Sequence, residues 1–348
     1  MKYNLESASW EITLKCNLKC FHCEFSAGKA SPDELSTNEA IKLCEDLAQA
    51  KCKRVILMGG EPFLRKDWYK IAKKIKDLDM ELAFITNGYS TSEKIFSKLQ
   101  DLSPRFVGVS IDGGTAQTHD KIRGVKGSFV RALNFVDTCI KLKLFTIIVT
   151  SIHKLNISEL PILRDVLFDR DVLWEIQMTD IAGRFPKKYL LDEKEFYSAA
   201  KFIAASQKVH PSGKKFINGA HDMGYNSDFL PNLTGLPKWE GCQAGISLIG
   251  IESNGGIKGC SALTSEFVED NIRKRNIVDI WNDPNSFSYN RNFKPSDLKG
   301  YCKECKYAKS CKGGCMETSY MTTGKIHCDP YCFHRIEKFD LKQPKLQI

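Results

Sequence analysis

Three cysteines lie close together near the start of the chain. Cys16, Cys20 and Cys23 stand in the stretch CNLKCFHC, which has the spacing CX3CX2C. Three thiolates this close can bind three irons of a 4Fe-4S cube and leave the fourth iron without a protein ligand. Structural zinc is almost always bound by four ligands, but no fourth cysteine lies nearby, and His22 would have to be the fourth ligand. The spacing therefore favours a cluster with an open iron, where a small chelating molecule can bind.

Polar motifs follow several apolar segments of the first half of the chain. They are Gly59-Gly60-Glu61-Pro62, Thr86-Asn87-Gly88, Ser110-Ile111-Asp112-Gly113 and Arg123-Gly124. Residues at the carboxyl ends of barrel strands meet at one face, where active sites of such folds assemble. We therefore expect these motifs to lie near the three cysteines. For any single polar residue, a role in a turn or a helix cap is an equally good explanation.

A second group of cysteines lies in the last third of the chain. Its members are Cys242, Cys260, Cys302, Cys305, Cys311, Cys315, Cys328 and Cys332. With Gly255, the first two give the spacing CX12GX4C, and the next four give CX2CX5CX3C. Disulfides are a poor explanation, because cytosolic thiols are kept reduced and no secretory signal is present. Metal or cluster binding is the better interpretation.

The elements that must position these residues alternate between short apolar runs and longer amphipathic stretches. This pattern predicts repeated βα units. The predicted strands are Ser9 to Thr13, Arg54 to Met58, Leu82 to Thr86, Phe106 to Ile111, Thr146 to Ser151 and Leu173 to Met178. The predicted helices are Ser36 to Ala50, Asp67 to Leu78, Ser92 to Leu99, Ser128 to Leu142, Ser158 to Phe168 and Asp192 to Lys208, with Ser36 and Ser158 as N-caps. Since six units are too few to close an eight-fold barrel, we predict an α/β fold of the partial (β/α)6 TIM-like barrel type.

We expect four segments along the chain. The barrel takes residues 1–210, a linker with Gly, Pro and Asn takes 211–241, a small iron-sulfur domain takes 242–335, and a tail takes 336–348. The iron-sulfur domain has few long periodic stretches, so we expect its metal sites to organise it more than an apolar core does.

The first cysteine group, together with the GGEP stretch, resembles the radical S-adenosylmethionine (SAM) superfamily. The resemblance implies that SAM binds the open iron and is cleaved to a 5′-deoxyadenosyl radical. It implies that Gly59, Gly60, Glu61 and Pro62 bind the SAM ammonium group, and that Ser110 and Arg123 contact its carboxylate. Asn87, Asp112, Asn156 and Gln177 are weaker candidates for nucleoside or substrate contacts.

The second cysteine group resembles the SPASM extension of this superfamily, which holds two auxiliary 4Fe-4S clusters. The resemblance assigns Cys302, Cys305, Cys311 and Cys332 to an outer cluster, and Cys242, Cys260 and Cys315 to an inner one. Three clusters are then expected in all. Some relatives have a further cysteine just before the position of Cys242, which this chain lacks. The inner cluster either keeps an open iron or recruits Cys328, Glu240 or His221. Cys328 has two further roles open to it, as an outer-cluster ligand in place of Cys332 or as a catalytic hydrogen-atom donor.

Members of this branch mostly modify peptides, so the leading hypothesis is a maturase that cross-links, oxidises or epimerises a ribosomally made peptide. A flavodoxin- or ferredoxin-type electron donor is implied. A separate leader-binding protein is one way to recognise the peptide, because the first strand begins almost at the N-terminus. The alternative is a small-molecule or tetrapyrrole-modifying enzyme of the haem branch, whose chains also begin with a strand like Trp10-Glu11-Ile12-Thr13. A non-catalytic iron-sulfur or zinc protein is the hypothesis from another class, and it predicts damaged SAM motifs.

Composition sets outer limits on these hypotheses. Of the residues, 42% are hydrophobic and 27% charged, and no apolar run is long enough to span a membrane. With no signal sequence, we expect a cytoplasmic protein. The net charge of +9 is spread singly along stretches such as Lys66 to Lys76, which favours solvated helix faces over a nucleic-acid site. Cys44, Cys52 and Cys139 fall on or beside predicted helices, where buried small side chains are the expected role.

Overall fold

The computed structural model describes residues 3–236 and 239–339. These residues form two compact units. The first unit comprises residues 3–148, 182–184 and 243–292, and the second comprises residues 149–181, 185–236, 239–242 and 293–339. Of the tail expected at 336–348, residues 340–348 lie outside the described residues. Within the described part of the chain, no helix is long and apolar enough to cross a membrane.

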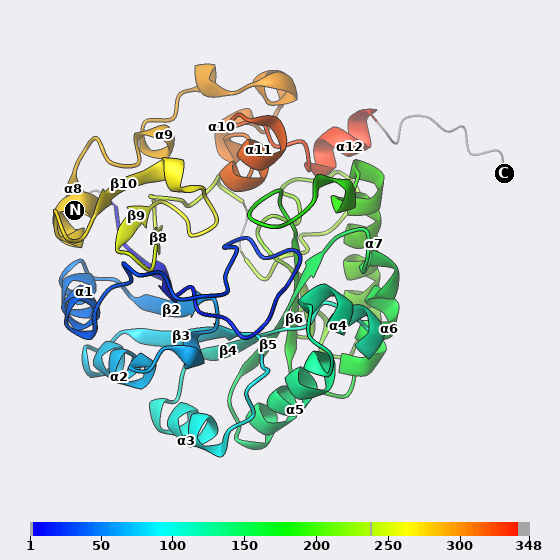
Figure 1. Ribbon diagram of the computed structural model, residues 1–348. Coiled ribbons are helices and arrows are strands. Elements are labelled where there is room, and N and C mark those ends of the chain that lie inside the picture. The colour runs from blue at the N-terminus through cyan, green and yellow to red at the C-terminus, as the bar shows by residue number, and fades with distance from the viewer. Residues whose placement is uncertain (1–2, 237–238, 340–348) are drawn as a thin grey trace. The chain divides into compact units, whose positions relative to one another are not determined.

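The first unit is built on parallel strands that alternate with helices. Its strands are β1 (Ser7–Thr13), β2 (Arg54–Gly59), β3 (Glu81–Thr86) and β4 (Phe106–Ser110). Its helices are α1 (Thr37–Gln49), α2 (Trp68–Asp77), α3 (Glu93–Leu102), α4 (Ala116–Arg123) and α5 (Ser128–Lys141). Strand β5 (Thr146–Ile152) spans the boundary between the units. In Figure 1, α1, α2 and α3 lie on the outer side of these strands.

Neighbouring strands of this unit pair in parallel, β1 with β2, β2 with β3 and β3 with β4. Trp10 lies opposite Leu57, and Leu57 lies opposite Phe84. All three side chains are fully buried. Burial of large apolar side chains at one level of neighbouring strands fixes the register, since a slip of one residue moves them to the other face. The carboxyl ends of the strands are thereby aligned.

Three further strands come from the segment after residue 243. They are β8 (Leu248–Ile251), β9 (Gly256–Lys258) and β10 (Val268–Asn271), followed by the short helices α8 (Ile277–Asn282) and α9 (Ser288–Arg291). β8 pairs in parallel with β1, and β9 and β10 continue antiparallel, so the strand order is β10-β9-β8-β1-β2-β3-β4. These strands were not predicted from the sequence, because each has only three or four residues.

The second unit contains the remaining elements. They are α6 (Leu160–Leu167), β6 (Leu173–Met178), α7 (Glu193–Val209), β7 (Ile217–Gly219), α10 (Ala308–Cys311), α11 (Met316–Thr323) and α12 (Phe333–Phe339). β6 and β7 pair in parallel. The segment expected to be a linker thus contains a short strand whose residues are buried.

All six predicted strands occur, with ends that differ by at most two residues from the prediction.

The N-cap at Ser36 is confirmed, since Ser36 and Glu39 form a reciprocal capping box. The N-cap at Ser158 is wrong. Ser158 lies inside the 3-10 turn Ile157–Glu159, and Asn156 organises this turn by accepting from the His153 backbone N–H and donating to the Ser151 carbonyl. This use of its side chain gives Asn156 a structural role.

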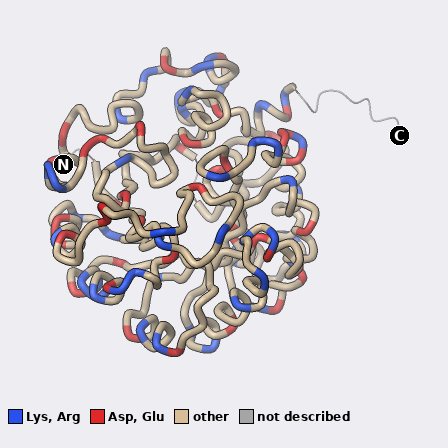
Figure 2. Tube along the Cα trace, viewed as in Figure 1, with Lys and Arg blue, Asp and Glu red and all other residues tan. Residues whose placement is uncertain are grey.

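Charges of both signs are interspersed on the helices of the first unit. Figure 2 shows Lys and Arg mixed with Asp and Glu along α1, α2 and α3. Ion pairs join helices, as between Lys74 and Glu45 at 2.7 Å. Mixed signs of this kind are typical of solvated helix faces.

Candidate functional site

The first three cysteines lie on the loop between β1 and α1. Backbone N–H groups point at two of their sulfurs, with Leu18 N 3.5 Å from Cys16 Sγ and Ala27 N 3.4 Å from Cys23 Sγ. The loop closes on itself where the Cys16 N–H donates to the Gly28 carbonyl at 3.0 Å. N–H groups aimed at sulfur favour the thiolate, which is the form that binds metal.

Burial acts in the opposite direction on these thiols. It raises the pKa of Cys16 to about 11, and it also raises the pKa of Cys20. Without a bound metal both groups hold their protons at neutral pH, Cys20 despite the nearby Arg123 guanidinium. A bound metal displaces such protons and takes the thiolates as ligands. The three thiols with their N–H donors therefore fit an iron-sulfur cluster.

Helix α4 holds this loop from one side. The Lys19 N–H donates to the Arg123 carbonyl and the Phe21 N–H to the Ile122 carbonyl, both at 3.1 Å. Gly124 ends the helix with φ +70°, and a Cβ there would lie 2.5 Å from the Lys19 carbonyl oxygen. Only glycine allows both the left-handed backbone and this close approach. The Arg123-Gly124 motif thus positions the cysteine loop.

Residues 182–184 hold the loop by further contacts within the first unit. Arg184 donates from its backbone to the Cys23 carbonyl at 3.0 Å, and from its guanidinium to the Cys20 and Ala27 carbonyls at 3.1 and 2.9 Å. A Cβ on Gly183 would lie 2.3 Å from the same Cys23 oxygen. These contacts were not predicted from the sequence, because a short segment that binds distant carbonyls leaves no local pattern.

A buried ion pair lies beside Cys20. The Arg123 guanidinium is 2.6 Å from Asp112 Oδ2 and its other terminal nitrogen is 3.8 Å from Cys20 Sγ, while His22 Nε2 is 3.3 Å from the same Asp112 oxygen. Although burial alone raises the pKa of a carboxyl, the charges of Arg123 and His22 hold the pKa of Asp112 well below its usual value. Asp112 is therefore a carboxylate that orients Arg123.

One nitrogen of the Arg123 side chain takes no part in this ion pair. Its Nε is buried and has no hydrogen-bond partner among the described residues. A buried unpaired donor is costly, so it marks a place where an acceptor fits. A carboxylate, such as that of SAM, is an acceptor of the right charge.

The GGEP stretch forms a tight turn at the end of β2. The Gly60 and Glu61 N–H groups donate to the Thr13 and Lys15 carbonyls at 2.8 Å, and a Cβ on Gly60 would lie 2.4 Å from the latter oxygen. Gly59 has φ +118°. Pro62 begins the 3-10 turn Pro62–Leu64. The turn therefore joins the ends of the first two strands, and its two glycines are required by backbone geometry.

The Glu61 side chain links this turn to the end of β3. It accepts from the Thr86 hydroxyl at 2.8 and 2.9 Å and from the Asn87 N–H at 2.9 Å. Burial raises the pKa of Glu61 to about 7. Asn87 in turn places its side-chain nitrogen 3.7 Å from Cys16 Sγ and 2.8 Å from Asn17 Oδ1. The structure thus brings the GGEP turn, Asn87 and Cys16 together.

Two predicted site residues have less defined surroundings. Ser110 is the last residue of β4 and is partly buried. Gln177 lies in β6 of the second unit, where its amide nitrogen donates to the Ser151 hydroxyl at 2.9 Å. The surroundings of Ser110 and Gln177 do not identify a ligand for either residue.

In the second unit, the thiols predicted for the outer cluster lie near one another. Burial, with a smaller contribution from the neighbouring thiols of Cys311 and Cys328, raises the pKa of Cys302 to about 12. Burial likewise raises the pKa of Cys332, whose thiol neighbours are Cys311 and Cys302. The Tyr307 N–H lies 3.4 Å from Cys305 Sγ. Both Cys328 and Cys332 are thus neighbours of Cys302.

Two of the thiols predicted for the inner cluster also meet in this unit. Cys242 and Cys315 are hydrogen-bonded through their side chains. His221 Nε2 lies 3.8 Å from Cys315 Sγ, and the Cys315 N–H donates to the Tyr225 hydroxyl at 2.7 Å. Cys260, the third predicted ligand, follows β9 in the first unit.

The three remaining cysteines are core residues. Cys44 on α1, Cys139 on α5 and Cys52 after α1 are exposed by 4% or less. Burial raises the pKa of each to about 12. They behave as small apolar side chains, as the sequence predicted.

A parallel-strand α/β unit with a three-thiol loop after its first strand defines an iron-sulfur protein of the barrel type. Two family models match the chain. The model of the radical SAM superfamily matches residues 10–166, and the model of SPASM, an iron-sulfur cluster-binding domain, matches residues 242–306.

Known proteins resemble the chain along most of its length. It is 28% identical to the AdoMet-dependent heme synthase of Methanosarcina barkeri, over 94% of this chain and 96% of the relative. It is 27% identical to the mycofactocin maturase MftC of Mycobacterium ulcerans, over 90% of this chain and 84% of the relative. The solved structure of native anSMEcpe with bound AdoMet matches with a TM-score of 0.74 at 17% identity, over 97% of this chain and 96% of that one. At that identity the match shows the fold.

The chain belongs to the radical SAM superfamily and carries a SPASM domain. The predicted α/β fold with a partial barrel and a C-terminal iron-sulfur domain is confirmed by the same matches. SAM and 4Fe-4S clusters are accordingly its cofactors.

Proposed function

We propose that this enzyme abstracts hydrogen from a ribosomally made peptide. When bound, the cluster and SAM supply a 5′-deoxyadenosyl radical by one-electron cleavage of the C5′–S bond with release of methionine, and this radical takes a hydrogen atom from the substrate. The observation that carries the proposal is the loop with Cys16, Cys20 and Cys23, whose thiols receive N–H donors and lie beside a buried, unpaired Arg123 Nε.

Different residues of the chain bind different groups of SAM. Arg123, with Ser110, binds the carboxylate, and Asp112 fixes the direction of the Arg123 guanidinium. Gly59, Gly60, Glu61 and Pro62 provide the ammonium site. Asn87, held by Glu61 beside Cys16, and Gln177 are candidates for nucleoside or substrate contacts. The SPASM cysteines hold two auxiliary clusters, which accept the electron left on the substrate or pass electrons inward.

Two partners follow from the proposal. A small electron donor of the flavodoxin or ferredoxin type supplies the electron for SAM cleavage. A separate leader-binding protein presents the peptide, or the barrel mouth recognises it directly. The similarity to a maturase, MftC, over 90% of the chain supports a peptide substrate.

The chemistry is tested by cofactor content and SAM cleavage. Anaerobic reconstitution is expected to give about twelve iron atoms per chain, as three cubes require. Incubation with SAM and dithionite should release 5′-deoxyadenosine, and this release should vanish when Cys16, Cys20 and Cys23 are changed to Ala. Cleavage that persists in the triple variant contradicts the proposal, and a preparation with intact clusters that never cleaves SAM supports a non-catalytic protein.

A tetrapyrrole of the haem branch is the second candidate substrate. It is favoured by the similarity to a heme synthase, which covers 96% of that relative. Co-expression with a short peptide encoded beside the gene, followed by mass spectrometry, tests the first candidate. Incubation with an iron-porphyrin bearing propionate groups tests the second. A mass change in the porphyrin and none in the peptide overturns the peptide proposal.

A further inference from the structure

His221 lies against one of the predicted inner-cluster thiols. Its Nε2 is 3.8 Å from Cys315 Sγ, and Cys315 is itself hydrogen-bonded to Cys242. Neutral imidazole nitrogen is a known iron-sulfur ligand, found where His replaces Cys. We propose that His221 is the fourth protein ligand of the inner auxiliary cluster. The inference rests on the proposed set of clusters and does not depend on the identity of the substrate.

The backbone around His221 is fixed by strand β6. The Ala220 N–H donates to the Ile176 carbonyl at 2.8 Å, and the Met178 N–H donates to Asp222 Oδ2 at 2.8 Å. The two residues that flank His221 are thus both tied to β6. A metal ligand on a rigid element is held more precisely than one on a free loop.

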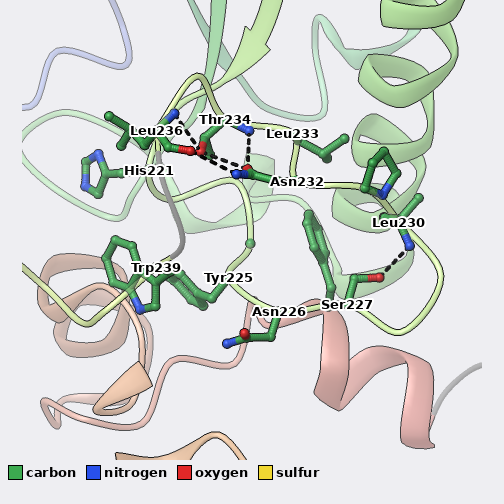
Figure 3. A pocket seen from close by; sticks show the side chains of 13 residues that line it. His221, Tyr225, Asn226, Ser227, Leu230, Asn232, Leu233, Thr234, Leu236 and Trp239 are labelled. Atoms are coloured by element: carbon green, nitrogen blue, oxygen red, sulfur yellow. Dashed lines mark hydrogen bonds between the residues drawn. The ribbon is translucent and has the colours of Figure 1, made fainter. Parts of the chain in front are cut away.

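The ring of His221 is positioned by an aromatic side chain. It lies 6.4 Å from the Trp239 ring, nearly parallel to it at 12°. Trp239 packs on Tyr225, at 4.6 Å between centroids, and donates from Nε1 to the Cys311 carbonyl at 3.2 Å. Figure 3 shows His221, Trp239 and Tyr225 lining one pocket, of about 290 Å³. The His221 side chain lines this pocket and is exposed to it.

The other candidates for the fourth ligand have different surroundings. Cys328 has Cys302, a predicted outer-cluster ligand, as its thiol neighbour, and its backbone N–H donates to the Ser319 hydroxyl at 2.8 Å. Glu240 is exposed. His221, by contrast, contacts an inner-cluster thiol directly through its Nε2.

Two carboxylates, Asp222, which is buried, and Asp180, which is partly buried, are further competitors. Asp222 and Asp180 both interact electrostatically with Cys315. One oxygen of each already accepts a hydrogen bond, from the Met178 N–H and from the Thr318 hydroxyl at 3.0 Å. They serve as matched controls, since each interacts with the same thiol but carries no imidazole nitrogen.

The experiment uses the full-length chain with Cys16, Cys20 and Cys23 changed to Ala, reconstituted anaerobically without SAM. This background removes the first cluster and with it any signal from His22, which lies between two of its ligands. Protein grown with ¹⁴N- or ¹⁵N-histidine is reduced and studied by pulsed EPR. We expect a strongly coupled histidine nitrogen that changes with the isotope. The absence of such a nitrogen overturns the proposal.

Variants then assign the nitrogen to a residue. His221→Cys should keep the iron content, lose the histidine coupling and lower the reduction potential of one auxiliary cluster, because a thiolate adds negative charge. His221→Ala should lose the coupling, whereas Asp222→Asn and Asp180→Asn should retain it. A coupling that survives in both His221 variants overturns the proposal. Since these readouts need neither SAM nor substrate, failure of SAM cleavage in the parent protein is a separate result.

Discussion

Arg123 and Asp112 form an ion pair that is almost fully withdrawn from water, with 2.6 Å between the guanidinium nitrogen and Oδ2. The two side chains are exposed by 10% and 0%. The same guanidinium lies 3.8 Å from Cys20 Sγ, so the pair joins the fourth strand's end to the cysteine loop. Breaking one partner of a buried pair leaves a charge without compensation, which costs far more than losing a surface pair.

Asp112→Asn is therefore expected to lower the free energy of unfolding by about 3–5 kcal/mol. The amide keeps the shape of the carboxylate but leaves the Arg123 charge uncompensated. Urea unfolding under anaerobic conditions, followed by tryptophan fluorescence, measures the loss.

The matched control for this variant is Glu81→Gln. Glu81 pairs with Arg54 at 2.5 Å, but their side chains are 45% and 36% exposed. Water screens such a pair, so the change should cost less than about 1 kcal/mol. Equal losses of unfolding free energy in the two variants would show that the buried Asp112 pair stabilises the fold no more than the exposed Glu81 pair does.

Gly124→Ala is expected to reduce the iron bound by the first cysteine group. A Cβ at this position meets the Lys19 carbonyl oxygen at 2.5 Å, which pushes the cysteine loop away from α4. The left-handed backbone at φ +70° adds about 1–2 kcal/mol of strain for a residue other than glycine. Iron and sulfide analysis after reconstitution checks the effect, with about four of twelve iron atoms at stake.

Gly127→Ala separates the strain from the collision. Gly127 has φ +82°, and a Cβ at this position would have no atom within 4 Å, so only the backbone strain applies. This variant should lose some stability and keep its iron. If it loses as much iron as Gly124→Ala, the contact with Lys19 is not the cause.

The sequence predicted the strands and the cysteine loop because both leave local signals. A buried strand such as Arg54–Gly59 is an apolar run bounded by polar residues, and the three thiols have a characteristic spacing. Helix α4, with the sequence AQTHDKIR, was missed because so few of its residues are apolar that no periodicity appears.

Long-range contacts left no such signal. Arg184 reaches the carbonyls of Cys20 and Ala27 from more than 150 positions away in the chain. β8 pairs with β1 although the two strands are about 240 positions apart. The sequence of the four residues of β8 does not identify β1 as its partner. The pairing of Arg123 with Asp112 was likewise not predicted, since both residues were assigned to SAM or substrate. These features depend on contacts between segments that are distant in the chain. Such contacts leave no local pattern in a single sequence.

Stability is expected to depend on pH through Glu11. Burial raises the pKa of this glutamate from 4.5 to about 8, although Lys258, 3.9 Å away, acts to lower it. The fold therefore favours the neutral form and binds a proton that the unfolded chain releases above pH 4.5. The stabilisation is full below that pH and is lost as pH rises through about 8.

Glu11→Gln removes this titration. The difference in unfolding free energy between wild type and variant should change by about 4–5 kcal/mol between acid and alkaline pH, in favour of the variant at high pH. Urea unfolding at a series of pH values measures it. Parallel pH profiles for the two proteins would mean that Glu11 is ionised to the same degree in both states.

Removal of single thiols tests which cysteine completes the proposed outer cluster. Cys332 is buried beside Cys311 and Cys302, so Cys332→Ala is expected to lose about four of the twelve iron atoms, whereas Cys328→Ala keeps them. Cys139→Ala is the control, because Cys139 is buried on α5, where its thiol is hydrogen-bonded to Thr146. Its iron content should match wild type even if its stability falls. The reverse pattern, with iron lost from Cys328→Ala and kept in Cys332→Ala, makes Cys328 the ligand and frees Cys332.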